Sequence, residues 1–327
     1  PDCPALGFVV QVRAASSVQQ ASRRSLCRQQ HSSRRRRSSR ATLEQQQTVL
    51  RRRPTLPLDE DALWAVFDDP TLRPQLDGTA AEVEDDLLRW AGATFDALGP
   101  MNRHAVTATR AASEMMAYSR RVVRERSVLP GSMGADVLAA ADEGRIERSQ
   151  CPALMIDYLG PSLDTTIGAI SGALHLFATH PDQWQAVRED PSLIPNAVNE
   201  VVRYESPIRA FSRRAVRQET IGDVVIPRGA RVLVLYASAN RDPREWHDPD
   251  SFDITRDASR QLGFGSGVHG CAGQGLARLE ASTMLRVLAE RVERIELTGT
   301  PSRAVNNVIH RFDRLPLRLV AAERRSS

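Results

Sequence analysis

The stretch Phe264-Gly265-Ser266-Gly267-Val268-His269-Gly270-Cys271-Ala272-Gly273 sets one cysteine among a phenylalanine, a histidine and glycines at fixed offsets. The glycines let the backbone turn tightly and approach a flat ligand closely. The run that follows, residues 274–280, is typical of a helix, so Cys271 is expected at a helix N-terminus. Free N–H groups and the helix dipole favour a thiolate at such a position. The stretch therefore predicts a cysteine that serves as an anionic ligand.

The pattern F-G-x-G-x-H-x-C-x-G is specific because it fixes six positions. Glycine makes up about 7% of residues and the other fixed types are rarer, so a chance match is on the order of one in a million per chain. The plainer interpretation is a buried free cysteine after a glycine turn. A thiolate presented from a glycine-rich loop is what a haem iron takes as an axial ligand, which favours a metal-binding role for Cys271.

This loop resembles the haem-ligand loop of the cytochrome P-450 superfamily, the haem-thiolate monooxygenases, in their soluble bacterial form. The resemblance covers roughly residues 80–320 and is strongest in roughly 150–290. It implies a mainly α fold with small β-sheets, an α+β class, and haem b with the Cys271 thiolate as its axial ligand. It also implies that the loop residues around this ligand contact the cofactor: Phe264, Gly265, His269 and Gly273.

The apolar pattern of residues 149–180 predicts one long helix with a polar segment near its middle. A proline there removes one backbone hydrogen bond, and Asp164 and Thr165 follow it. A carboxylate beside a hydroxyl at a distorted helix can hold water and pass protons. Alone, this pair equally fits a solvent-facing polar turn. The segment resembles the family's oxygen-activation segment, which implies catalytic roles for Asp164 and Thr165, although Pro161-Ser162 departs from the usual small pair.

Glu200 and Arg203 lie one turn apart on a predicted short helix. In isolation such a pair is usually a surface ion pair of little worth. In the resembled family the same spacing gives a buried pair that locks the core near the haem, which implies that role here. The family's third partner has no counterpart at Ser251, so Arg256 or Arg241 is expected to replace it.

Further helices and strands follow from periodicity and turn signals. The resemblance implies that the two helices before the long one roof the substrate pocket, whereas their pattern alone fits ordinary packing helices equally well. The predicted helices are Glu82–Leu98, Arg103–Arg126 and Pro195–Glu205, and the predicted strand-like runs are Ile208–Ala215, Ile221–Ile226 and Val232–Tyr236, with turns predicted at Gly222-Asp223 and Pro227-Arg228-Gly229.

The first of these strands passes beside the haem in the resembled family, which implies that Arg213 pairs with a haem propionate. A solvated charge in an arginine-rich strand is the alternative for Arg213. The resemblance also implies that His269 contacts a propionate. The positions expected to line the substrate pocket, which suggest a small or medium apolar molecule, are Leu159, Ser162, Ile208, Phe211 and Ser212.

Residues 1–53 differ from the rest of the chain in charge. They hold 12 arginines and two acidic residues, a balance of +10, so with +4 overall residues 54–327 carry −6. This Arg/Ser-rich segment has too few apolar residues to offset its ordering entropy, which predicts disorder and separates it from a domain over 54–327. We interpret it as non-native or misread sequence joined to an N-terminally truncated enzyme. A nucleic-acid-binding arm, a transit peptide and a solvated tail without function are the alternatives.

The resemblance implies a haem-dependent monooxygenase that inserts one oxygen atom of dioxygen into its small-molecule substrate, by hydroxylation or O-dealkylation. Electrons are expected from a separate ferredoxin- or flavin-type protein, because the sequence shows no reductase motif. The early strand and helix of full-length members are not found, so a truncated haem-binding remnant with little activity is the alternative. A basic nucleic-acid-binding protein acting through residues 1–53 is a further alternative that we do not favour.

Two sequence features bear on localisation. No run of 18 apolar residues exists, which argues against a transmembrane helix. The four cysteines are scattered and form no disulfide or zinc spacing, which fits a reducing compartment. We therefore expect a cytoplasmic protein without a membrane partner.

Overall fold

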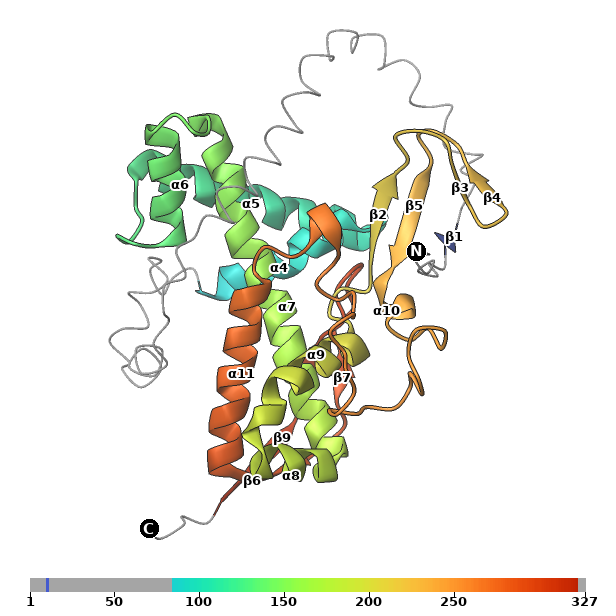
Figure 1. The fold of residues 1–327 in the computed structure, drawn as a ribbon. Coiled ribbons are helices and arrows are strands. Elements are labelled where there is room, and N and C mark those ends of the chain that lie inside the picture. The colour runs from blue at the N-terminus through green and yellow to red at the C-terminus, as the bar shows by residue number, and fades with distance from the viewer. Residues whose placement is uncertain (1–9, 12–83, 323–327) are drawn as a thin grey trace.

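The computed structural model describes residues 10–11 and 84–322 (Figure 1). These residues form a helix-rich fold with four small antiparallel sheets, so the predicted α+β class is confirmed. The predicted disorder of residues 1–53 falls outside the described residues, apart from Val10–Gln11, and stays a prediction.

The helices before the cysteine loop that were predicted agree with their ranges to within a few residues, and the start of the first lies outside the described residues. The helix predicted over 274–280 begins as expected and continues to Arg291. The sequence patterns missed the short helices Met133–Asp142, Pro181–Glu189 and Tyr236–Ala239. The helices are α4 (Glu84–Leu98), α5 (Arg103–Glu125), α6 (Met133–Asp142), α7 (Cys151–Thr179), α8 (Pro181–Glu189), α9 (Ile194–Glu205), α10 (Tyr236–Ala239) and α11 (Gln274–Arg291), with short 3-10 turns η3 (Arg148–Gln150), η4 (Pro191–Leu193) and η5 (Gly267–His269).

The strands form one three-stranded sheet of order β1-β5-β2 and the two-stranded sheets β3-β4, β7-β8 and β6-β9, the last of which joins strands that are separated by β7 and β8 in the chain. The turn predicted at Gly222-Asp223 is confirmed, and it means that the strand-like run Ile221–Ile226 is not one continuous strand, because Gly222 at φ +57° turns the chain so that β3 and β4 pair as a hairpin. The strands are β1 (Val10–Gln11), β2 (Ala210–Arg214), β3 (Glu219–Ile221), β4 (Val224–Ile226), β5 (Arg231–Leu235), β6 (Val292–Leu297), β7 (Ser302–Arg303), β8 (Phe312–Arg314) and β9 (Leu317–Ala321).

The long helix α7 is the centre of the fold and contacts α4, α5, α6, α9, α11 and β6. Pro152 lies in its first turn, where a missing N–H is tolerated, and Pro181 follows its C-cap residue His180. Gln150 immediately precedes the helix, and its side chain makes no capping hydrogen bond. The helix continues through Pro161. Its 29 residues span roughly 43 Å, so one rigid element carries the polar segment across the domain.

One face of α7 carries small residues at intervals of four, and neighbouring elements pack against its backbone. A Cβ on Gly160 would lie 3.1 Å from Thr94 Oγ1 of α4, and one on Gly172 would lie 2.8 Å from Glu205 Cγ of α9. Residues four apart share a helix face, so Asp164 lies on the same stripe, and it is buried. The stripe therefore places a carboxylate inside the helix packing.

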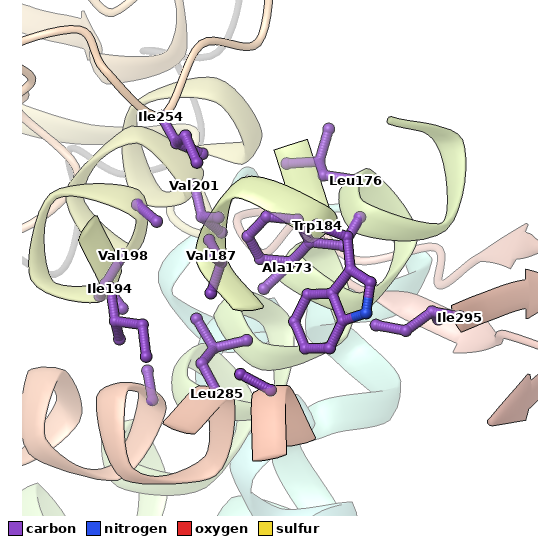
Figure 2. Close-up of a cluster of buried hydrophobic side chains, with 14 of the residues drawn as sticks. Ala173, Leu176, Trp184, Val187, Ile194, Val198, Val201, Ile254, Leu285 and Ile295 are labelled. Atoms are coloured by element: carbon purple, nitrogen blue, oxygen red, sulfur yellow. The ribbon is translucent and has the colours of Figure 1, made fainter. Parts of the chain in front are cut away.

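The largest hydrophobic core lies where α7, α8, α9 and α11 meet β6 (Figure 2). The rings of Phe177 and Trp184 lie 5.2 Å apart, and the indole N–H of Trp184 donates to the carbonyl oxygen of Glu293 at 3.2 Å. A buried tryptophan needs such a partner for its polar atom. Val201 of α9 and Leu285 of α11 belong to the same cluster. This core fixes α9 against α11, the two helices that flank the cysteine loop.

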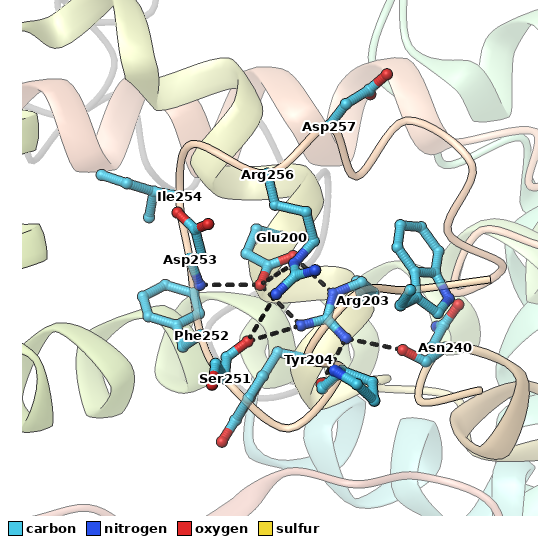
Figure 3. Close-up of polar contacts among 12 residues, drawn as sticks. Glu200, Arg203, Tyr204, Asn240, Ser251, Phe252, Asp253, Ile254, Arg256 and Asp257 are labelled. Atoms are coloured by element: carbon cyan, nitrogen blue, oxygen red, sulfur yellow. Dashed lines mark hydrogen bonds and ion pairs between the residues drawn. The ribbon is translucent and has the colours of Figure 1, made fainter. Parts of the chain in front are cut away.

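Glu200 and Arg203 of α9 form a fully buried ion pair (Figure 3). Nε and Nη2 of Arg203 donate to the two carboxylate oxygens at 2.6 and 2.8 Å, and both side chains are 0% exposed. The guanidinium also donates to the carbonyl oxygens of Asn240, Pro249 and Ser251. A buried pair is tolerated only when its other donors are satisfied, and here those donors tie α9 to two distant loops.

Arg256 is the third charged member of this network, and Arg241 is not. Nε of Arg256 lies 3.4 Å from Glu200 Oε1, whereas Arg241 pairs with Asp250. Ser251 contributes its carbonyl oxygen, which accepts from Arg203 at 3.1 Å, and not its side chain. The network therefore joins the loop before the cysteine motif to α9.

Replacing Glu200 by glutamine is expected to destabilise the fold, because Arg203 would keep its buried charge without a counter-ion. Loss of one partner of a buried pair costs about 3–5 kcal/mol. Urea denaturation measures the free energy of unfolding, and Glu290→Gln, at an exposed position of α11, is the control. A loss in Glu200→Gln no larger than in the control would contradict a structural role for the pair.

Candidate functional site

The cysteine loop closes on itself through a backbone hydrogen bond. The N–H of Cys271 donates to the carbonyl oxygen of Phe264 at 2.7 Å. Between them η5 turns the chain, and Gly265 and Gly267 take φ values of +72° and +62°. Glycine adopts this left-handed region far more readily than other residues, so the glycines of the motif shape the loop.

Glycine also allows the loop to pack closely. A Cβ on Gly263 would lie 2.5 Å from Val202 Cγ1 of α9, and one on Gly265 would lie 2.8 Å from the carbonyl oxygen of His269. Neither distance is possible for a real side chain. The loop backbone is therefore pressed against α9, the helix that carries the buried ion pair.

Cys271 lies just before α11, whose N-cap is Gly273. Burial raises the pKa of the Cys271 thiol, and this rise is opposed by backbone N–H groups of Gly273 and Gln274 and by the charge of Arg278. These groups favour the thiolate form. Since a bound metal cation replaces the thiol proton, the loop is arranged to hold a thiolate against a metal.

The open side of the loop suits a flat group. Cys271 is exposed, and a Cβ on Gly267 would meet no described atom within 4 Å. A Cβ on Gly273 would touch the Cys271 sulfur at 4.0 Å, and no other atom in the described part of the chain comes closer. A thiolate, backbone donors to its sulfur and a smooth glycine surface are what haem requires on its ligand side. The residues present therefore fit the predicted cofactor.

Asp164 is buried at the middle of α7 and is 2% exposed. Its Oδ1 lies 3.2 Å from Nε of Arg311, whereas Oδ2 has no hydrogen-bond partner among the described residues. A Cβ on Gly92 of α4 would lie 3.3 Å from Oδ2, so α4 covers this oxygen. Burial raises the pKa of Asp164, Arg311 opposes the rise and Asp96 adds to it. A buried carboxyl with one unpaired oxygen can take up and release a proton.

Thr165 and Ser162 donate their hydroxyl protons within α7. Oγ1 of Thr165 donates to the carbonyl oxygen of Pro161 at 2.7 Å, and Oγ of Ser162 donates to that of Tyr158. Each hydroxyl oxygen keeps lone pairs that can accept a hydrogen bond. Thr165 therefore follows Asp164 directly in the sequence, and its hydroxyl oxygen can still accept a hydrogen bond.

Arg213 and His269 lie on different elements. Arg213 in β2 donates to Tyr236 Oη at 3.2 Å and to the carbonyl oxygen of Ser212 at 3.1 Å, whereas His269 is exposed in η5. These contacts orient the guanidinium of Arg213. The haem propionate contacts of both residues stay predictions.

Two of the predicted pocket residues lie together. Ile208 and Phe211 pack against a small cluster formed by Phe95 of α4 with Val308 and Ile309. The segment that follows α9 therefore packs against α4, one of the two helices expected to cover the substrate pocket. The other predicted pocket residues are partly or fully exposed on α7 and β2, and their roles stay predictions: Leu159, Ser162 and Ser212.

Arg311 and Arg278 are site residues that the sequence did not reveal. Arg311 lies far along the chain from Asp164, and one arginine among 44 basic residues forms no pattern. Arg278 is four residues from Gln274 on the predicted helix, a spacing that indicates contact between the two side chains. The motif alone gave no reason to examine either arginine.

Replacing Gly265 by alanine is expected to disrupt the loop. Alanine in the left-handed region costs about 1–2 kcal/mol, and its Cβ would clash with the His269 carbonyl at 2.8 Å. Gly144→Ala is the matched control, because Gly144 has φ +69° and its Cβ would meet no described atom within 4 Å. Urea denaturation and haem content should show the larger losses in Gly265→Ala. Equal losses in both variants would contradict the close packing.

Replacing Asp164 by asparagine is expected to change how stability depends on pH. A pKa raised above its ordinary value of about 3.9 means that the native state binds the proton more tightly than the unfolded state. Wild-type stability therefore falls as pH rises from about 4 through the native pKa. The unfolding free energy of Asp164→Asn relative to wild type should increase over that interval. Exposed Asp313→Asn should show no such change, and a pH-independent difference for Asp164→Asn would contradict the raised pKa.

Comparisons with known proteins agree with this geometry. The family model described as Cytochrome P450 matches residues 98–293. Cytochrome p450 CYP199A2 of Rhodopseudomonas palustris is 40% identical over 249 residues, which cover 76% of this chain and 60% of that protein. The 6-deoxyerythronolide B hydroxylase of Saccharopolyspora erythraea is 36% identical over 219 residues, which cover 64% of this chain and 54% of that protein. The chain thus spans less than two thirds of the length of either relative.

Solved structures give the same result. The structure of cytochrome P450 CYP109Q5 from Chondromyces apiculatus superposes with a TM-score of 0.64 and 34% identity, over 77% of this chain and 64% of that one. Epothilone D-bound cytochrome P450epoK superposes with a TM-score of 0.68 and 29% identity, over 76% of this chain and 64% of that one. The fold of the described residues is therefore that of solved cytochrome P450 structures.

Within the described residues, no helix combines the length and apolarity needed to cross a bilayer.

The cofactor of the matched family is haem on a cysteine thiolate, which is the group that the Cys271 loop fits. The family model matches more than half of the sequence, from the last residue of α4 to two residues past the end of α11. The chain belongs to the cytochrome P450 family.

Proposed function

We propose that this protein is a haem-thiolate monooxygenase that inserts one oxygen atom of dioxygen into a small or medium apolar substrate. The observation that carries the proposal is the Cys271 loop, in which glycines of positive φ hold an exposed cysteine just before the N-terminus of α11. The names of two relatives support the reaction type: 6-deoxyerythronolide B hydroxylase and, at 33% identity, linalool 8-monooxygenase of Pseudomonas putida.

The haem, when bound, supplies the binding and activation of dioxygen and the oxidation of the substrate. Cys271 holds the iron on the side of the loop, and the N–H groups of Gly273 and Gln274 stabilise its negative charge. Phe264 and Gly265 hold the loop around the ligand. Arg213 and His269 serve as the cationic and polar contacts to the haem propionates.

Asp164 and Thr165 would deliver protons to the oxygen chemistry that the haem supplies when bound. Insertion of one oxygen atom and release of the other as water consumes two protons and two electrons. The unpaired Oδ2 and the raised pKa of Asp164 support a role in proton delivery. The hydroxyl of Thr165, which already donates to the Pro161 carbonyl, accepts a hydrogen bond from a water on that route.

The remaining assignments concern substrate and partners. Leu159, Ser162, Ile208, Phe211 and Ser212 line the pocket, and hydroxylation and O-dealkylation are both within the chemistry of such a site. A separate ferredoxin- or flavin-type protein supplies the two electrons. We place the protein in the cytoplasm, in line with the expectation from its cysteines.

Cys271→Ala tests the proposal through the carbon-monoxide difference spectrum of the reduced protein. The wild type is expected to show a thiolate-type spectrum, and Cys271→Ala should lose it because no other thiolate replaces the ligand. Cys151→Ala is the matched control, because Cys151 is fully buried in α7 and should not affect ligation. A thiolate-type spectrum that persists in Cys271→Ala, or disappears in Cys151→Ala, would overturn the assignment.

A second measurement separates an enzyme from a haem-binding remnant. Purified protein with a ferredoxin, its reductase and an apolar test substrate should couple electron consumption to oxygenated product. A thiolate-type spectrum without coupled product, over a panel of apolar substrates, would support the remnant and overturn the monooxygenase proposal.

A further inference from the structure

Arg278 joins three elements around the cysteine loop. Its guanidinium carbon lies 4.4 Å from the centre of the Phe264 ring. Nε donates to Oδ1 of Asn199 in α9 at 3.2 Å, and Nη1 donates to Oε1 of Gln274 in the first turn of α11 at 2.8 Å. The guanidinium of Arg278 therefore stacks on a ring and donates two hydrogen bonds at the same time.

These contacts link the two ends of the loop to the buried network. Phe264 begins the motif, Gln274 begins the helix after it, and Asn199 precedes Glu200 in α9. The planar, forked guanidinium can stack on a ring and donate in fixed directions together, whereas an ammonium cannot. A cation held over an aromatic face is attracted to the ring, so this contact ties the start of the loop to α11.

We infer that Arg278 is a positioning residue for the cysteine ligand: by clamping Phe264 to α9 and α11, it fixes the loop in which Cys271 presents its sulfur. The inference rests on the proposed role of Cys271 and concerns how that ligand is held. Arg278 acts through Phe264 and through the start of α11. It holds the ring at the start of the loop, while the N–H of Cys271 bonds to the Phe264 carbonyl.

The loop also has supports that do not involve Arg278. Gly263 packs against Val202, and the positive φ values of Gly265 and Gly267 shape the turn. Removal of the Arg278 side chain should therefore leave the loop folded but loosely held. The expected consequence is a ligand that opens to solvent more often.

Amide hydrogen exchange of the peptide spanning 264–273 tests the clamp in the haem-free protein. In Arg278→Gln we expect exchange about tenfold faster, which corresponds to about 1.4 kcal/mol, with little change elsewhere in α11. Arg278→Lys keeps the charge without the planar fork and should exchange almost as fast as Arg278→Gln. Arg286→Gln, at an exposed arginine two turns further along α11, is the control and should match the wild type.

The haem-loaded protein gives a second readout. Arg278→Gln should convert from the thiolate-type to the thiol-type carbon-monoxide spectrum several-fold faster than the wild type. Phe264→Leu should produce a similar change, and the double variant should add little, because both substitutions break the same contact. If Arg278→Gln fails to fold, Asn199→Ala removes one arm of the clamp alone and should give a smaller acceleration in both measurements.

The outcomes separate this inference from the proposed function. Exchange and spectral conversion within twofold of wild type in Arg278→Gln, or fully additive effects of Arg278→Gln and Phe264→Leu, would overturn the clamp while Cys271 remains the ligand. Faster amide exchange in haem-free Arg278→Gln, combined with a thiolate-type spectrum in Cys271→Ala, would overturn the assignment of Cys271 as the ligand and leave the clamp intact.

Discussion

The buried charge of Arg203 is the constraint on which the rest of this structure depends. A guanidinium without water has to find an acceptor for each of its donors, and Arg203 finds them on Glu200 and on three carbonyl oxygens from two loops. Asn240, one of those acceptors, also receives the N–H of Leu262 on its side chain at 2.7 Å. The chain that enters the cysteine loop is thereby fixed by the same network, so the ligand's position follows from satisfying one buried cation.

The second constraint is the close packing along α7. Small residues at intervals of four let α4 and α9 approach its backbone, and Asp164 occupies one position of that stripe. Its partner, Arg311, comes from the C-terminal part of the chain and reaches one carboxylate oxygen. The carboxyl is consequently held in place but only half neutralised, a state that a surface position would not produce because water would satisfy the free oxygen.

The helices and the cysteine motif could largely be predicted from the sequence. The C-terminal strands and the arginines that contact Asp164 and Phe264 could not. The periodicity of 149–180 matched α7 because a long helix with one buried face leaves a clear pattern. The short helices Met133–Asp142, Pro181–Glu189 and Tyr236–Ala239 were missed, and so were the strands β6 to β9, whose two to six residues are too few for a reliable period. The turn at Gly222-Asp223 was predicted, because glycine followed by aspartate is a local signal, and it divides the run Ile221–Ile226 into two paired strands.

The sequence by itself determined the ligand loop, the long helix with its Asp164-Thr165 segment and the spacing of Glu200 and Arg203, since each depends on residues close together in the chain. The tertiary structure decided which distant groups complete them. It chose Arg256 over Arg241 as the third charge near Glu200, paired Asp164 with Arg311, and set Arg278 against Phe264. The physical reason is that local periodicity and turn chemistry act over a few residues, whereas a buried charge is neutralised by whichever partner the packing of remote segments brings within reach.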